Sequence, residues 1–176
     1  GRFVSAKPGR SAQRDLAVPA RACFSLALSW DKRPDFEMLF AAGSEAMARL
    51  KTGGKAGGDP KAPGKTGGKK QAAAEEYRIE ATSGELLAIR EGATAKFDVA
   101  GSLPAGRGGV TLEVFIDQER GRMVVVIPQG AGNDKPVFDE TIAPRKPDVQ
   151  SGFGIRLRSG DVRIDGLRVS PWRDPE

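Results

Sequence analysis

Apolar and polar residues alternate along most of this 176-residue chain, as they do in β-strands that bury one face. The clearest run covers residues 23–30, where every second residue is large and apolar and the residues between are serine or alanine. Trp30 ends this run in the apolar register, so we expect its indole in the core. Further runs share the pattern: residues 35–40, 76–82, 85–91, 95–101, 109–117, 121–129, 152–158 and 161–169.

Short strands separated by turn residues, with almost no helical periodicity, predict an all-β fold, an antiparallel sandwich or a barrel. Residues 118–121 read Gln-Glu-Arg-Gly between two strong runs and suit a hairpin connection. Residues 43–50 are compatible with a helical turn. In the runs between residues 76 and 101, we expect these side chains to point inward: Tyr77, Ile79, Leu87, Ile89, Phe97 and Val99.

The alternation breaks once, near the end of the chain. Val162 and Ile164 are apolar at even positions, whereas Leu167 and Val169 are apolar at odd positions. Two structures explain the switch across Asp165-Gly166: a tight hairpin turn, or one continuous strand with a bulge. A hairpin would leave arms of three residues each, so the bulged strand is favoured.

Residues 50–74 differ in composition from the rest of the chain. Within them, residues 51–70 hold six lysines and one aspartate, which equals the net charge of +5 of the whole chain. Subtracting them from 28 basic and 23 acidic residues leaves 22 of each. Rich in Gly and poor in large apolar residues, residues 50–74 are predicted to be a disordered insertion in a single domain spanning residues 1–176.

Two functions are conceivable for this basic segment, a phosphate-binding loop and a contact with anionic polymers. The sequence Gly-Lys-Thr at 64–66 resembles a phosphate-binding loop, but Asp59 stands where that motif requires glycine. The six lysines suit weak, salt-sensitive contact of residues 51–70 with anionic polymers, as an alternative to a merely tolerated loop. Aromatic residues are absent there, so no specific nucleic-acid binding is expected.

Composition excludes several kinds of chemistry. The chain has no histidine and one cysteine, Cys23, which removes Ser-His and Cys-His catalysis, zinc knuckles and internal disulfides. Asp161 and Asp165 could ligate calcium, but both lie beside glycines in common turn sequences, and the turn is favoured. We therefore predict no cofactor and no metal. No apolar run approaches the ~20 residues of a membrane span.

The closing sequence "GFGIRLRSGDVRIDGLRVSPW" resembles the last strands of the concanavalin A-like jelly-roll superfamily. The most similar branch is that of the 3-keto-disaccharide hydrolase-like or laminin-G-like domains of planctomycete type, whose closing strand carries the same switch of parity. "VTLEVFIDQERGRMVVVIP" resembles their preceding hairpin, and Arg14-Asp15-Leu16 resembles part of their opening strands. The resemblance implies a concanavalin A-like jelly-roll β-sandwich, and it brings no catalytic motif.

Glucanases of this superfamily carry Glu-x-Asp-x-Glu or Glu-x-Asp-x-x-Glu on one strand. Neither sequence occurs here. The nearest pair is Glu113 and Asp117, which a strand places roughly 13 Å apart. Retaining and inverting glycosidases need about 5–5.5 Å and 6.5–9.5 Å respectively. Phe115 stands on the polar face of the same strand, and Trp172 ends the last one. As ligand-binding candidates we therefore take Phe115, Glu113, Asp117 and Trp172.

These observations favour a non-catalytic, carbohydrate-directed binding module over an enzyme. The resemblance implies an exported bacterial protein, located outside the cell, in the periplasm or at the cell surface, with a polysaccharide or surface glycan as partner. The chain begins with Gly1 rather than Met, so we expect the export signal to lie upstream. A glycoside-cleaving enzyme and a self-assembling structural module are the alternatives.

Overall fold

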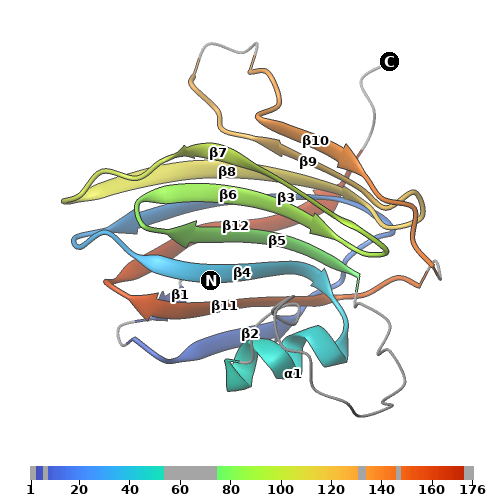
Figure 1. Ribbon diagram of the computed structural model, residues 1–176, viewed down its shortest axis with the longest axis horizontal. Coiled ribbons are helices and arrows are strands. Elements are labelled where there is room, and N and C mark those ends of the chain that lie inside the picture. Colours follow the sequence, from blue (N-terminus) through green and yellow to red (C-terminus); the bar gives the residue numbers. More distant parts are fainter. Residues whose placement is uncertain (1–2, 6–7, 54–74, 131–133, 146–147, 173–176) are drawn as a thin grey trace, which may run out of the picture.

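The protein is described by a computed structural model that covers residues 3–5, 8–53, 75–130, 134–145 and 148–172. Two six-stranded antiparallel sheets pack face to face, and one helix lies outside them (Figure 1). The fold is a jelly-roll β-sandwich: the alternation of apolar and polar residues predicts an antiparallel sandwich or barrel, and the resemblance to the concanavalin A-like superfamily predicts the jelly roll.

The first sheet, sheet A, contains both ends of the described chain. Its strands lie in the order β1-β12-β3-β8-β9-β10. Their bounds are β1 Phe3–Ser5, β3 Arg21–Trp30, β8 Gly108–Asp117, β9 Arg122–Val126, β10 Phe138–Thr141 and β12 Val162–Pro171.

The second sheet, sheet B, carries the helix on its outer face. Its strands lie in the order β2-β11-β4-β5-β6-β7. Their bounds are β2 Ser11–Asp15, β4 Asp35–Ala42, β5 Glu76–Thr82, β6 Glu85–Glu91, β7 Ala95–Ser102 and β11 Gly152–Ser159.

The core fills the space between the two sheets. Trp30 is fully buried there, as predicted, and its indole N–H donates to the carbonyl of Gly106 at 3.0 Å. Phe24 of sheet A meets Phe40 and Phe153 of sheet B, with ring centroids 5.3 and 6.5 Å away. Edge-on and offset contacts of this kind add to the burial of the rings and fix the sheets against each other.

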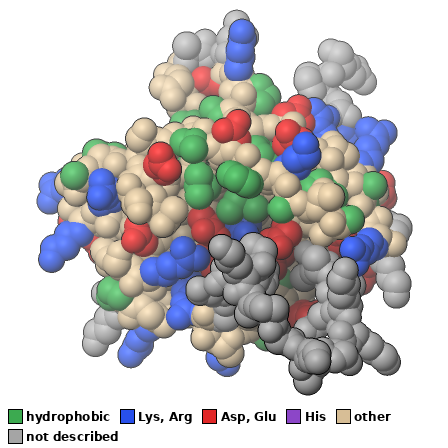
Figure 2. All heavy atoms as spheres, in the orientation of Figure 1, with side chains coloured by type: hydrophobic (Ala, Val, Ile, Leu, Met, Phe, Trp, Pro, Cys, Tyr) green, Lys and Arg blue, Asp and Glu red, His purple; other side chains and the backbone are tan. Residues whose placement is uncertain are grey.

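The prediction for β6 and β7 was wrong about which side chains face inward. Leu86 and Ala88 join the core, whereas Leu87 and Ile89 lie on the outer face of sheet B, paired with Val99 and Phe97. The sequence of β6 is apolar at both parities, so alternation could not choose a face. Phe97 is consequently 73% exposed. Figure 2 shows hydrophobic side chains gathered in the middle of this face, bordered by charged ones.

The helix α1, Ser44–Thr52, packs on the outer face of sheet B. Ala46, Met47 and Leu50 are buried against Leu39 and Ala42 of β4. The insertion predicted from residue 50 therefore begins too early, because residues 50–52 belong to the helix. The remainder of that prediction, residues 54–74, lies outside the described part of the chain.

The parity break is a β-bulge, as predicted. β12 is continuous, Asp165 pairs with Ala27 and Arg168 pairs with Ser25, so two residues of β12 face one residue of β3. Gly166 sits in the bulge with φ of 67°, in the left-handed region that favours glycine. The extra residue turns Val162 and Ile164, and then Leu167 and Val169, toward the same core.

Gly166→Val is expected to lower the free energy of unfolding by about 1–2 kcal/mol, because a β-branched residue is strained at this φ. A side chain meets no atom within 4 Å there, so the loss would report backbone strain and not a clash. Urea unfolding measures it. Gly106→Val is the matched control, since Gly106 is equally open and has no positive φ. Equal stability of the two variants would contradict the bulge.

One buried arginine ties the sheets together at one end of the sandwich. The guanidinium of Arg90, on β6, donates to the carbonyls of Gly121 at 2.8 Å and Ile142 at 2.7 Å, which flank sheet A strands. It also pairs with Glu75 at 2.6 Å and lies 4.5 Å from the ring centroid of Tyr77. Burial raises the pKa of Tyr77 to about 12, with Arg90 opposing that rise.

The buried tyrosine makes stability depend on pH in alkali. Below pH 10 its phenol is neutral in both states; from pH 10 to about 12 it ionises first in the unfolded chain. Folding is then expected to lose about 2–3 kcal/mol that was fully present below pH 10. Tyr77→Phe should remove this component from the pH dependence of urea unfolding. Because Tyr77 is the single tyrosine, tyrosinate absorbance reads its titration directly; a native midpoint near pH 10 would contradict the prediction.

Candidate functional site

The four predicted ligand-binding residues lie on the outer face of sheet A, and three of them are linked by contacts. Trp172 follows β12, and its backbone N–H donates to the carbonyl of Arg21 at 3.0 Å. Its ring reaches Phe115 of β8, with centroids 5.6 Å apart and planes inclined by 54°. Arg21 contacts both the Trp172 ring and the carboxylate of Asp117, and so joins these two residues. Sheet pairing thus builds a cluster from residues far apart in the chain.

Two arginines support the tryptophan. The guanidinium carbon of Arg21 lies 5.1 Å, and that of Arg122 lies 5.5 Å, from the Trp172 ring centroid. Arg21 is 3.3 Å from the carboxylate of Asp117, and Arg122 makes two hydrogen bonds with Asp139 at 2.8 and 2.7 Å. The hydrogen bond from Arg122 lowers the pKa of Asp139. Contacts of this type fix the ring by cation–π attraction.

Neither arginine is among the residues predicted from the sequence. Arg21 and Arg122 occupy the ladder positions on either side of Asp117, one on β3 and one on β9. Their position at the start of each strand was visible in the sequence. The strand order that brings them beside Trp172 was not.

Glu113 and Asp117 have different roles in this cluster. Asp117 is 2% exposed, and its carboxylate accepts the backbone N–H groups of Glu119 and Arg120 at 3.1 and 2.9 Å. It thereby fixes the β8–β9 turn from beneath the surface. Glu113 is half-buried and engages no described residue in a hydrogen bond or ion pair. Of the four residues, the half-buried Trp172, Phe115 and Glu113 are therefore the ones with surface left for a ligand.

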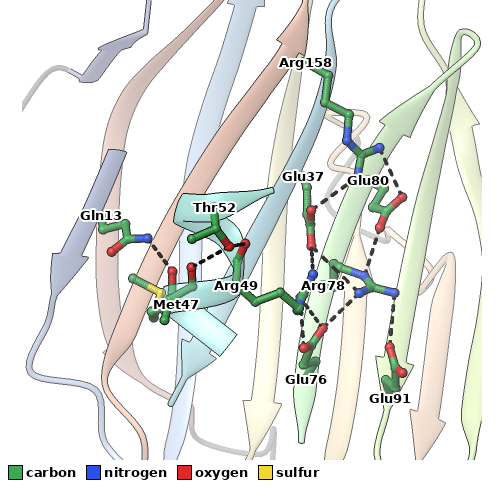
Figure 3. A network of polar contacts seen from close by, with 11 residues as sticks. Gln13, Glu37, Met47, Arg49, Thr52, Glu76, Arg78, Glu80, Glu91 and Arg158 are labelled. Atoms are coloured by element: carbon green, nitrogen blue, oxygen red, sulfur yellow. Dashed lines mark hydrogen bonds and ion pairs between the residues drawn. The ribbon is translucent and has the colours of Figure 1, made fainter. Parts of the chain in front are cut away.

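The outer face of sheet B carries a second polar cluster, which we call the ion network (Figure 3). Arg49 of α1 stands at its helix side and binds two carboxylates at once. Its Nη1 lies 3.0 Å from Glu37 of β4, and its Nη2 donates to both oxygens of Glu76 of β5 at 2.9 and 2.8 Å. These bonds hold the helix against the sheet.

Arg78 occupies the centre of the ion network. It contacts Glu76 at 2.9 Å, Glu80 at 3.1 Å and Glu91 at 3.2 Å. Arg158 of β11 adds contacts with Glu37 at 3.2 Å and Glu80 at 3.6 Å. Three guanidinium groups therefore hold four carboxylates together.

Burial dominates the electrostatics of the ion network. It raises the pKa of Glu76, while the charges of Arg49 and Arg78 oppose that rise and Glu91 adds to it. Glu37, Glu76 and Arg78 are only 4–6% exposed. The alternation of residues 76–80 predicts that Glu76 and Arg78 face away from the core. It does not predict that their partners on β4, β11 and α1 would bury them.

Among the described residues, no three histidine, cysteine, aspartate or glutamate side chains are placed so that they could hold one metal ion; the four glutamates of the ion network are bound by arginines instead. The carboxylate of Asp161 accepts the backbone N–H groups of Asp31 and Lys32, which belong to the connection between β3 and β4, far away in the chain. No described helix is long and apolar enough to cross a membrane.

Two cavities lie away from both clusters. One of about 570 Å³ opens between β2 and α1, beside Gln13, Asp15, Met47 and Gln150. The other, of about 410 Å³, opens between the ends of the two sheets beside Leu86, Ile127 and Val137. The residues of the Trp172 cluster line neither of these two cavities.

Comparison with known proteins supports the fold. No protein-family model and no curated protein matches the chain. Solved structures do: a sialidase (TM-score 0.56, 12% identity) matches 92% of this chain and 14% of its own, so this chain spans only a small part of that protein. Sheep galectin-11, in complex with glycerol (TM-score 0.51, 10% identity), matches 92% of this chain and 98% of its own.

A third structure is an uncharacterized protein from Mycobacterium paratuberculosis, with a TM-score of 0.54 and 10% identity over 91% of this chain and 73% of its own. At these identities the likeness extends to the fold alone. It agrees with a jelly-roll β-sandwich; the concanavalin A-like superfamily and its planctomycete-type branch stay predictions.

Arg78→Met is expected to lower the free energy of unfolding by roughly 3 kcal/mol at pH 7, because it leaves buried carboxylates without their central cation. The loss should shrink near pH 4, where Glu76, with its raised pKa, takes up a proton. Urea unfolding at both values measures the difference. Arg78→Met with Glu76→Gln should recover part of the loss at pH 7. An equal loss at both pH values would contradict an electrostatic role.

Proposed function

We propose that this chain is a non-catalytic carbohydrate-binding module that holds its ligand on the outer face of sheet A. The observation that carries the proposal is the contact between Trp172 and Phe115 at 5.6 Å, with the carboxylate of Glu113 on the same strand as Phe115. An aromatic surface with an adjacent hydrogen-bond acceptor matches the two sides of a sugar ring.

The physical basis is the polarity of the two partners. One face of a pyranose presents C–H groups, which carry a slight positive charge and fit the negative face of an aromatic ring. The equatorial hydroxyls at its rim donate hydrogen bonds, which the carboxylate of Glu113 can accept. Arg21 and Arg122 hold the Trp172 ring in place before binding, which lowers the entropic cost of ordering it.

The shape of the surface favours a long ligand over a small one. The cluster lies on the outer face of sheet A and lines neither of the two cavities described above, so we favour a ligand that lies along the sheet over an enclosed monosaccharide. A polysaccharide or cell-surface glycan instead repeats the same contact along its length, and weak single contacts then add through multivalency. Such a ligand agrees with an exported bacterial protein that is part of a larger polypeptide.

The glycoside-cleaving alternative has its best carboxylates on the other sheet. Arg49 bridges Glu37 and Glu76, and the raised pKa of Glu76 is a property that general acids share. Both groups are 4–5% exposed and bound by arginine, so a substrate would have to displace Arg49 first. Binding without cleavage is therefore the function we favour.

Trp172→Ala and Phe115→Ala are each expected to weaken binding of soluble oligosaccharides by about tenfold or more, because each removes a stacking surface. Glycan arrays identify the ligand, and calorimetry measures the affinity. Phe97→Ala is the matched control, since it removes an exposed aromatic ring from the opposite sheet.

Equal loss of binding in the Phe97→Ala control would contradict the proposed site. Release of reducing ends by the wild-type protein, abolished in Glu76→Gln, would contradict the absence of catalysis.

A further inference from the structure

We propose that two copies of this chain pair through the free edges of their β7 strands and form a symmetric dimer with one continuous sheet. This inference is independent of the carbohydrate site, which lies on the other sheet. β7 is the last strand in the order of sheet B, and it is visible at the upper margin of that sheet in Figure 1. In the described part of the chain, its outer edge pairs with no strand. Residues 95–99 are all exposed.

The apolar surface beside this edge indicates a protein partner. Phe97 is 73% and Val99 is 49% exposed, and they lie next to Ile89 and Leu87 on the outer face. An exposed strand edge that carries apolar side chains is a template for pairing with another chain. Proteins that stay monomeric usually protect such an edge with charged side chains, so Lys96 and Asp98 require an explanation.

The hydrogen-bonding parity of β7 fixes which residues face outward. The N–H of Val99 donates to the carboxylate of Asp98 at 2.7 Å, so it is satisfied outside the β6 ladder. Since backbone groups alternate along a strand, the N–H and C=O groups of Ala95, Phe97 and Val99 point to the open side. A second strand would therefore bond to these three residues.

The charges then select one register. When Phe97 pairs with Phe97 of the second copy, Lys96 lies opposite Asp98 on both sides of the two-fold axis. A shift of the register by two residues in either direction keeps the bonding parity and places Lys96 opposite Lys96, or Asp98 opposite Asp98. Like charges in direct opposition are destabilising, so Lys96 and Asp98 exclude these neighbouring registers and permit one. Charge complementarity thus identifies a second copy of this chain as the partner.

The paired arrangement satisfies the remaining groups. Lys96 and Asp98 occupy positions without mutual backbone bonds, where opposite side chains approach most closely. When Asp98 turns to the lysine of the second copy, it releases the N–H of Val99 for the new ladder. On the outer face, the two Phe97 rings meet, and Val99 lies opposite Ala95. The two-fold axis uses both β7 edges, so the assembly closes as a dimer.

Sedimentation equilibrium over protein concentrations up to roughly 100 µM tests the proposal. We expect a species of twice the monomer mass of 18.7 kDa. Lys96→Glu should raise the dissociation constant at least about tenfold, because it places like charges opposite each other twice. Lys96→Asp combined with Asp98→Lys should restore dimerisation. Lys51→Glu is the matched control, with the same change in charge at an exposed residue of α1, which packs against β11, β4 and β2 at the far side of sheet B.

Thermal unfolding checks that each variant is folded, which the exposure of these side chains predicts. A monomer at all concentrations would overturn the proposal. A dimer that is unchanged by Lys96→Glu, or that the double exchange fails to restore, would overturn the β7 register.

Discussion

The structure depends on the buried guanidinium of Arg90, because it joins sheet B to the ends of strands in sheet A, which strand pairing alone cannot do. Its donors reach the carbonyls of Gly121, Ile142 and Glu91 and the carboxylate of Glu75. Two sheets that touch only through apolar side chains can slide, since the hydrophobic effect is not directional. Hydrogen bonds from a planar group that is 0% exposed remove that freedom.

The surroundings of Arg90 show how closely the chain is fitted to it. Gly121 has φ of 71°, and a side chain there would meet the carbonyl oxygen of Ile142 at 1.9 Å and Arg90 at 2.8 Å. The β8–β9 turn can come this close to Arg90 and Ile142 only because residue 121 is glycine. The same turn is fixed from its other end by Asp117, whose partner Arg21 supports Trp172. The β8–β9 hairpin therefore contacts both Arg90, which joins the two sheets, and Arg21, which supports the proposed sugar-binding residue Trp172.

Alternation in the sequence predicts most of this fold, because a strand that buries one face has apolar residues at every second position. The bulge at Gly166 was predictable for the same reason, since an extra residue leaves a visible switch of parity. β6 was not, because Leu86, Leu87, Ala88 and Ile89 are apolar at both parities. Pairing with β5 and β7 decides which side chains of β6 face the core, and the sequence of β6 alone does not show this.

The candidate site divides along the same line. Phe115 and Trp172 were each identifiable as large aromatic residues at polar or terminal positions of strands. Arg21 and Arg122 were not, since an arginine near a strand end is ordinary until the strand order is known. The ion network is harder still, because Glu37, Glu76 and Arg78 acquire their burial from a helix and a strand far away in sequence.

The outer faces of the two sheets hold their aromatic side chains in different ways, and this difference separates their proposed roles. On sheet A, Trp172 lies beside Phe115 and two arginines, so its ring is held in one place whether or not a ligand is present. On sheet B, Phe97 stands at an edge with 73% of its surface in water and open backbone groups beside it. A fixed ring suits recognition of a small, repeated contact, whereas an exposed ring on an unpaired edge gains most from another strand. Sheet A is accordingly the better surface for a glycan, and sheet B the better surface for a second protein chain.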